Sequence, residues 1–447
     1  MAGILITRVF TLAMLWIVSI AVLAHPAHSQ RLIRDAEIEY SLRKLARPVL
    51  TAAGLNAGRI KILVINDSSL NAFVIDNNHM FIHSGLILKL KTHQELQAVI
   101  AHEAAHIANG HISRRLANIR SAKTAAGLGA LLCAAAAATS GNSTAGAGCA
   151  LGAAGSAQRV FLAHTRGEEV SADQSGARYM ARAGIDPQAM VDVLDIFRGQ
   201  EALSASRRDP YALTHPLSRE RLRAIKGYAA AYAPQGKPDP NAAYWHARTR
   251  GKLGAFLRNS RWSLREAKRA GYKDVAMMIR AVAYHRMPNV KKALHEINAL
   301  IKIRPNDPYV HELKGQILLE SRQAKAGAAA YAKAVSLAPR EPLILAGYGR
   351  ALLAQNTKAS IKKALGVLEK ARARDPQDAR MMRDLAVAYA KSGNNGMASL
   401  ATAERYAIQG RLKDAAIHAK RASGLLPRGS AGWNRAQDVL RAAKAAQ

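Results

Sequence analysis

The hydrophobic and polar positions of the N-terminal half alternate with two different periods. Apolar residues recur at near-helical spacing between Ile33 and Leu45, which predicts a helix over residues 30–58 that breaks at Pro48. From residue 60 onward the apolar residues no longer recur at helical spacing. The chain therefore begins with a helix and then changes to extended structure.

Three short runs rich in β-branched and apolar residues follow this helix. They predict strands over residues 60–65, 71–75 and 80–83, the first two paired with each other. Helical patterns then predict helices over residues 94–109 and 166–183. This part of the chain is expected to be an α+β domain with a small sheet.

Beyond about residue 243 the pattern is helical and repeats. Small residues and a terminal proline recur as in a tetratricopeptide unit, which is a pair of helices. Such units stack into a curved solenoid that binds extended peptides or partner helices on its concave face, although a helical domain without a ligand is the alternative. The intervals between the unit-closing prolines are 34, 37 and 51 residues, the last being a unit and a half: Pro305, Pro339, Pro376 and Pro427.

The first residues resemble a secretory signal. Arg8 precedes an apolar run from Val9 to Ala24, and small and polar residues come after it. We expect a cleavable signal peptide over residues 1–29 and export to the periplasm. An uncleaved membrane anchor is the alternative, although the run is short for a bilayer span.

Residues 125–157 are dominated by Ala and Gly, with a polar break in the middle. Each apolar arm is too short to cross a membrane as a helix, so two close-packed or lid-like helices are favoured over a membrane hairpin. Cys133 and Cys149 flank the break. In an oxidising compartment they could form a disulfide, and the sequence leaves free thiols equally open.

The net charge of +34 and the pI near 10.6 favour acidic partners, whether nucleic acid, anionic lipid or protein. The Lys and Arg residues are spread over the C-terminal helices without a nucleic-acid-binding signature. We interpret them as solvated helix faces, with attraction to an anionic membrane surface as the alternative. Export argues against nucleic acid.

The candidate chemistry begins with the run His102-Glu103-Ala104-Ala105-His106. Positions four apart lie on one face of a helix, so both imidazoles can point at one metal ion with Glu103 beside them. Two imidazoles and a carboxylate suit one zinc ion and leave a fourth position for water. Zinc lowers the pKa of that water toward about 7, and Glu103 would accept its proton.

A third ligand is expected from the helix over residues 166–183. Glu169 and Asp173 lie four residues apart and face the same way, whereas Glu168 points off that face. Glu169 would complete the ligand set, and Asp173 would orient a ligand imidazole. The alternative is an exposed, solvated acidic turn.

Several further elements accompany these motifs, and together they resemble the peptidase family of HtpX and the CaaX prenyl protease. The signal peptide and repeat tail are similar to the periplasmic branch of that family. The elements are Asn71-Ala72-Phe73, Ser84-Gly85-Leu86, Glu95-Leu96, His111 and Glu169-x-x-Ala172-Asp173.

The resemblance implies roles for individual residues. His102, His106 and Glu169 would bind zinc, Glu103 would be the catalytic base, and Asp173 would support the site. A substrate strand would add to the edge formed by Asn71, Ala72 and Phe73.

Thr214-His215-Pro216 and Arg221 resemble a later element of the family that lies near the metal. His215 and Arg221 are therefore candidate catalytic residues that could hydrogen-bond the oxyanion. Alternatively, His215 could fill the open metal position and keep the enzyme latent until a substrate displaces it.

Two departures from the family pattern are visible. Ala105 replaces the usual glycine before the second zinc histidine, and a glycine-containing turn is here Asn77-Asn78-His79. The second departure bears on the substrate-binding edge. Packing or surface roles are expected for the remaining histidines of the region: His79, His83, His111 and His164.

These observations predict a mainly α protein with a gluzincin-type domain followed by a tetratricopeptide-like solenoid. We expect a zinc metallopeptidase domain over residues 30–230, a Pro-, Gly- and Lys-rich linker over 231–242 and the repeats over 243–447. The expected activity is hydrolysis of misfolded or stalled exported proteins, recruited by the repeats, which could also contact the outer-membrane assembly machinery. The alternative is a chaperone or assembly scaffold with little proteolysis.

Overall fold

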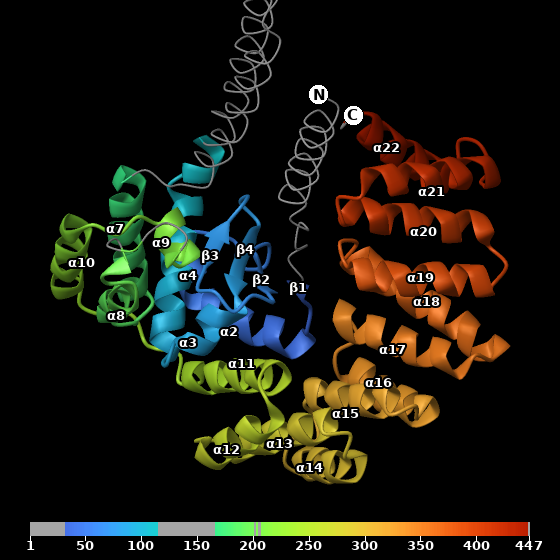
Figure 1. Cartoon of the computed structure of the whole chain (residues 1–447), viewed down its shortest axis with the longest axis horizontal. Helices are drawn as coiled ribbons and strands as arrows, with labels where there is room; N and C mark the ends of the chain where they lie inside the picture. Colours follow the sequence, from blue (N-terminus) through green and yellow to red (C-terminus); the bar gives the residue numbers. More distant parts are fainter. Residues whose placement is uncertain (1–31, 115–165, 201–202, 204–206, 446–447) are drawn as a thin grey trace, which may run out of the picture.

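A computed structural model describes residues 32–114, 166–200, 203 and 207–445 (Figure 1). The predicted signal peptide, the Ala- and Gly-rich segment with both cysteines, and His164 lie outside the described residues. Among those that are described, no helix is long and apolar enough to cross a membrane.

The sheet has four strands in the order β1 (Leu32–Ile33), β2 (Lys61–Ile65), β4 (His79–His83) and β3 (Ala72–Val74). β2 pairs in parallel with β4, and β3 pairs antiparallel with the other side of β4. The predicted pairing of the first two runs is therefore wrong, because β4 lies between them.

The loop after β2 explains why β2 and β3 do not pair. The Gly85 N–H and the Ser84 hydroxyl both donate to the Asp67 carbonyl, which fixes the loop to the end of β4. A Cβ on Gly85 would lie 2.1 Å from the Ser68 carbonyl oxygen, so only glycine permits this approach. Met80 and Ile82 are fully buried, as expected for the strand with neighbours on both sides.

Helix α2 (Ala36–Ala52) begins at Asp35, whose carboxylate accepts hydrogen bonds from the Glu37 and Ile38 N–H groups. The predicted break at Pro48 is wrong, because the helix continues for another turn. Proline removes one backbone donor there. Burial of Val49 and Leu50 in the core holds the last turn in place.

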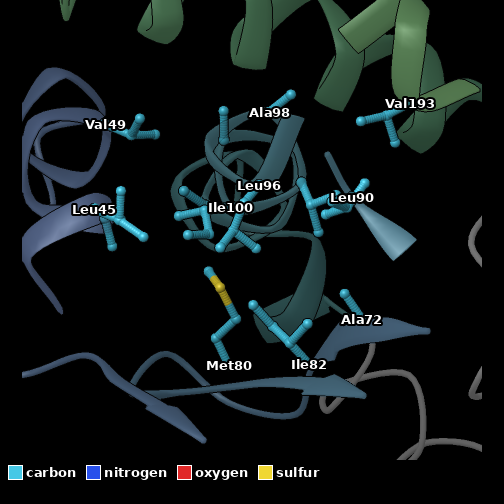
Figure 2. Close-up of a cluster of buried hydrophobic side chains, with 14 of the residues drawn as sticks. Leu45, Val49, Ala72, Met80, Ile82, Leu90, Leu96, Ala98, Ile100 and Val193 are labelled. Carbon is cyan, nitrogen blue, oxygen red and sulfur yellow. The ribbon is translucent and has the colours of Figure 1, made fainter. Parts of the chain in front are cut away.

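Helices α3 (Ser84–Lys89) and α4 (His93–Ala108) follow β4. Thr92 and Glu95 form a capping box that fixes the start of α4. Figure 2 shows Leu96 and Ile100 of α4 pointing toward Met80 and Ile82 of the sheet, within a cluster to which α2 and α8 also contribute. This apolar packing holds α4 against the sheet.

The described residues of the N-terminal part include four further helices: α7 (Arg166–Arg182), α8 (Gln188–Ile196), α9 (Pro210–Thr214) and α10 (Arg219–Ala231). Small residues allow α7 to pack closely along α4. A Cβ on Gly176 would already lie 3.4 Å from the Ala101 backbone. The acidic residues of α7 are thereby brought close to the histidines of α4.

The C-terminal part is a stack of helix pairs that curves beside the N-terminal part (Figure 1). Pro305, Pro339, Pro376 and Pro427 each follow a helix, namely α14, α16, α18 and α21. The fold class predicted from the sequence is therefore confirmed. The helices are α11 (Ala242–Leu257), α12 (Ser260–Arg269), α13 (Lys273–Arg286), α14 (Val290–Ile303), α15 (Pro308–Glu320), α16 (Ala324–Leu337), α17 (Pro342–Gln355), α18 (Lys358–Arg374), α19 (Ala379–Lys391), α20 (Asn395–Ile408), α21 (Leu412–Leu425) and α22 (Ala431–Ala445).

Buried charges join the two parts. Lys252 of α11 is fully buried, with its Nζ 2.9 Å from an Asp35 carboxylate oxygen and 3.1 Å from a Glu37 oxygen. Arg248 contacts Glu37 and also Asp307, each at 2.5 Å. Helix α11 therefore packs on α2 through ion pairs as well as apolar contacts, and the domain limits at residues 231–242 stay a prediction.

Candidate metal centre

Two helices bring the predicted ligands together. His102 and His106 lie one turn apart on α4, with 3.1 Å between their Nε2 atoms. The Glu169 carboxylate of α7 lies 3.5 Å from the Nε2 of His102 and 3.4 Å from that of His106. All three side chains are buried.

His215 joins this cluster from the residue after α9. Its Nδ1 lies 3.3 Å from the His102 Nε2 and 3.0 Å from a Glu169 oxygen. One ligand atom from each of these four residues lies within 4.8 Å of the other three. The arrangement therefore offers four donor atoms to a single point.

Each of the three imidazoles has one nitrogen that faces the other donors, called inner here, and one that faces away from them, called outer. The outer nitrogens have partners of their own. The His102 Nδ1 lies 3.0 Å from Asp173, the His106 Nδ1 lies 2.8 Å from His111, and the His215 Nε2 lies 3.2 Å from the Ala72 carbonyl oxygen. Carboxylate and carbonyl acceptors require the proton on the outer nitrogens of His102 and His215. Their inner nitrogens then present lone pairs to the centre.

The separations fit a tetrahedral metal ion. Ligand atoms bound at about 2.0–2.1 Å in a tetrahedral site lie about 3.3 Å apart. Five contacts between the four residues, counting either oxygen of Glu169, range from 3.0 to 3.5 Å, and one ligand atom from each residue lies within 4.8 Å of the other three. Imidazole nitrogens with one carboxylate are a donor set that zinc accepts.

Arg221 of α10 is buried and contacts two of the three acidic residues of α7, Glu169 and Asp173. Its Nε lies 2.5 Å from Asp173, and its Nη1 lies 2.6 Å from Glu169. Burial alone would raise the pKa values of these two carboxyl groups, but the Arg221 guanidinium and the neighbouring imidazoles together lower both, that of Glu169 well below its usual range. Both groups are therefore anionic, and Arg221 positions them while remaining a candidate for the predicted oxyanion contact.

Glu103 is fully buried beside the cluster without belonging to the four donors. One of its carboxylate oxygens lies 3.5 Å from the His215 Nε2. Its place next to the ligand atoms is the one that a general base requires.

The segment that carries His215 lies against the outer strand of the sheet. The Tyr211 N–H donates to the Leu70 carbonyl, and the Thr214 hydroxyl lies 3.4 Å from the Asn71 side-chain oxygen. β3 is an edge strand, and it contains Ala72 and Phe73. The predicted substrate-binding residues and His215 therefore lie side by side.

The other histidines have different partners. His79 lies 2.8 Å from Asp76, and His83 lies 3.0 Å from Ser69. His111 contacts the ligand His106 and so supports the site from outside the four donors. Packing and hydrogen bonding account for all three.

Sequence reasoning missed Tyr211. Its buried ring lies 4.4 Å from that of His215 and stacks on Phe197 at 4.7 Å between ring centroids. The one signal available was its position four residues before His215, which follows the short helix that carries Tyr211. Tyr211 holds the His215 ring in place.

Comparisons with known proteins agree with this geometry. Residues 32–229 match the model of peptidase family M48. The chain is similar to the beta-barrel assembly-enhancing protease of Yersinia pestis, with 26% identity over 407 residues, which are 87% of this chain and 79% of the relative. A relative from Vibrio cholerae is 32% identical over 226 residues, and this match spans 50% of this chain and 45% of the relative's length.

Among solved structures, the chain is similar to YrrB, a tetratricopeptide-repeat protein, with 18% identity and a TM-score of 0.32. That match covers 39% of this chain and 91% of YrrB. The match over residues 32–229 includes α4, α7 and α10, which carry the buried histidine and carboxylate cluster. Residues 32–229 therefore form a metallopeptidase domain of peptidase family M48.

Proposed function

We propose that this chain is a periplasmic, zinc-dependent endopeptidase that cleaves misfolded or stalled exported proteins, including outer-membrane proteins. The observation that carries the proposal is the convergence of His102, His106 and Glu169 from two helices, with Glu103 beside them. The similarity to beta-barrel assembly-enhancing proteases supports the class of substrate.

His102, His106 and Glu169 would hold the zinc ion. When bound, zinc would polarise the scissile carbonyl and acidify a water molecule. Glu103 would accept a proton from the attacking water and deliver it to the leaving amine. Asp173 accepts a hydrogen bond from the Nδ1 of His102 and so orients that ring. Arg221 holds Asp173 and Glu169 in place through ion pairs.

The substrate would bind as an added strand on β3. Backbone hydrogen bonds to an edge strand tolerate many sequences but require an extended, unfolded chain. The repeats, which flank the sheet in Figure 1, would recruit such chains. Residues 211–215 contact the same edge, so productive binding requires this segment to move.

Metal removal tests this function. Purified mature chain should cleave a denatured β-barrel protein, lose this activity after treatment with a chelator and regain it with zinc but not with magnesium. Electrophoresis of the substrate over time measures the cleavage. Undiminished cleavage by chelated protein that contains no zinc would refute the mechanism.

His215→Ala should raise basal cleavage. The His215 Nδ1, which lies close to His102 and Glu169, would fill the fourth position of a tetrahedral site and leave no place for water. If the open state is populated at about 10% or less, removing the imidazole should increase the rate by about tenfold or more.

Cleavage of a short unfolded peptide under steady-state conditions measures this change. His79→Ala, which removes an imidazole paired with Asp76, is the matched control. A slower His215→Ala enzyme would indicate that His215 assists the oxyanion instead. An unchanged rate would exclude both roles.

A further inference from the structure

Helix α21 presents two large apolar side chains to solvent. Ile417 is 67% exposed and Leu425 is 53% exposed, the highest values among the large hydrophobic residues that the structure describes. The residues that α21 buries are all alanines, which pack against α20 and α22: Ala415, Ala419 and Ala422. The inward face of α21 thus carries only small side chains, and two large ones lie outside it.

Three basic residues surround Ile417 on the solvent side of α21. Lys413, Lys420 and Arg421 lie three or four residues from Ile417, so they are its neighbours on the helix surface, and all three are exposed. A Cβ on Gly424 would meet no heavy atom of a neighbouring element within 4 Å, which shows that this side is open. Figure 1 shows α21 near the end of the repeat stack, far along it from α11. The exposed face of α21 consists of Lys413, Ile417, Lys420, Arg421 and Leu425.

The charges around this face are strongly unbalanced. Residues 395–445 contain nine Lys and Arg residues and three acidic residues. Each acidic residue is paired with an arginine: Glu404 with Arg435 at 2.6 Å, Asp414 with Arg411 at 2.7 Å, and Asp438 with Arg441. Within the described residues, Lys413, Lys420 and Arg421 form no ion pair. The exposed face therefore carries positive charge that the protein does not neutralise.

This charge selects an anionic partner and argues against a second copy of the chain, whose own basic face would be repelled. A protein partner fits poorly. Stable protein interfaces bury about 800 Å² on each partner, are enriched in aromatic residues and are depleted of lysine. The exposed face of α21 has two lysines, no aromatic residue, and two aliphatic side chains about 12 Å apart along the helix. An anionic membrane needs no complementary shape, attracts each nearby basic residue and accepts apolar side chains between its headgroups.

We propose that the exposed face of α21 binds the surface of an anionic phospholipid membrane. Ile417 and Leu425 enter the boundary between headgroups and acyl chains, where their apolar surface leaves water. Lys413, Lys420 and Arg421 reach the lipid phosphates, because their long aliphatic stems can follow the apolar boundary while the charged ends stay in water. The helix lies on the membrane and does not span it. This membrane contact does not depend on the proposed function.

Vesicle flotation of the mature chain, residues 30–447, tests this surface. Wild-type protein should float with vesicles of equal parts phosphatidylglycerol and phosphatidylcholine, and not with phosphatidylcholine alone. Higher salt should weaken the binding, because the attraction is partly electrostatic. Since residues 1–29 are left out, the apolar run from Val9 to Ala24 cannot account for flotation.

Ile417→Ser combined with Leu425→Ser should lower the affinity for the anionic vesicles by about tenfold or more. This variant keeps the net charge, and it should fold like the wild type because both side chains are exposed. Ile303→Ser combined with Val387→Ser is the matched control. It removes two exposed aliphatic side chains from α14 and α19 and should keep the wild-type affinity.

Lys420→Gln combined with Arg421→Gln should also lower the affinity by about tenfold or more, because each basic residue near an anionic surface contributes to binding. Lys325→Gln combined with Lys333→Gln removes the same charge from exposed positions of α16 and should change the affinity little.

Absence of wild-type flotation would overturn the proposal and favour an acidic protein as the partner. Flotation that neither α21 variant weakens would also overturn it. Equal losses in the α21 variants and their controls would do so as well, because they would reduce the binding to the overall charge and apolar surface of the chain.

Discussion

Glu103→Gln should reduce cleavage of a denatured protein by about 10²–10⁴-fold, the usual contribution of a general base. The amide has nearly the same shape as the carboxylate but cannot accept the proton of the attacking water. Glu103 is buried beside the four donor atoms and is not one of them. Zinc content and thermal stability should therefore stay close to those of the wild type.

Steady-state cleavage and metal analysis of the same preparation check this prediction. Glu168→Gln is the control, because Glu168 is an acidic residue next to Glu169 that is not one of the donors. A Glu103→Gln enzyme that cleaves at the wild-type rate would overturn the mechanism. Complementation separates the two functions considered from the sequence. A scaffold would still work in cells with Glu103→Gln, whereas a protease would not.

The central part of the site could be predicted because it depends on local spacing. His102 and His106 lie on one face of α4 by helical periodicity alone, and Glu169 and Asp173 share a face of α7 for the same reason. That these two helices come together was inferred from the ligands that a zinc ion needs, namely both imidazoles and a carboxylate. The distances between their side chains agree with it.

Longer-range features could not be derived in this way. His215 is 113 residues from His102, and the resemblance to a known family was needed to bring it near the metal. The strand pairing failed because the order in a sheet depends on which strand is buried on both sides, and β4 is that strand here. Local hydrophobic patterns do not contain this information.

The partners of buried basic residues could not be predicted from local patterns either. The sequence suggested that basic residues of the C-terminal helices are mainly solvated, yet Lys252 and Arg248 are buried and pair with acids of the N-terminal part. Asp35 is 217 residues from Lys252. The acids that neutralise a buried cation cannot be identified before the fold is known.

Glu169→Ala should abolish tight zinc binding while the protein stays folded. It removes the one carboxylate among the four donor atoms, whereas Arg221 keeps its ion pair with Asp173 and is not left uncompensated. Glu168→Ala removes the adjacent carboxylate, which belongs to none of the donor positions, and should leave zinc binding intact.

Zinc content after dialysis shows whether these side chains form a metal centre. We expect about one zinc ion per chain in the wild type and in Glu168→Ala, and far less in Glu169→Ala. Circular dichroism of the same samples verifies that each is folded. Folded wild-type protein without zinc, or Glu169→Ala protein that retains it as tightly as the wild type, would mean that His102, His106 and Glu169 do not form a zinc site.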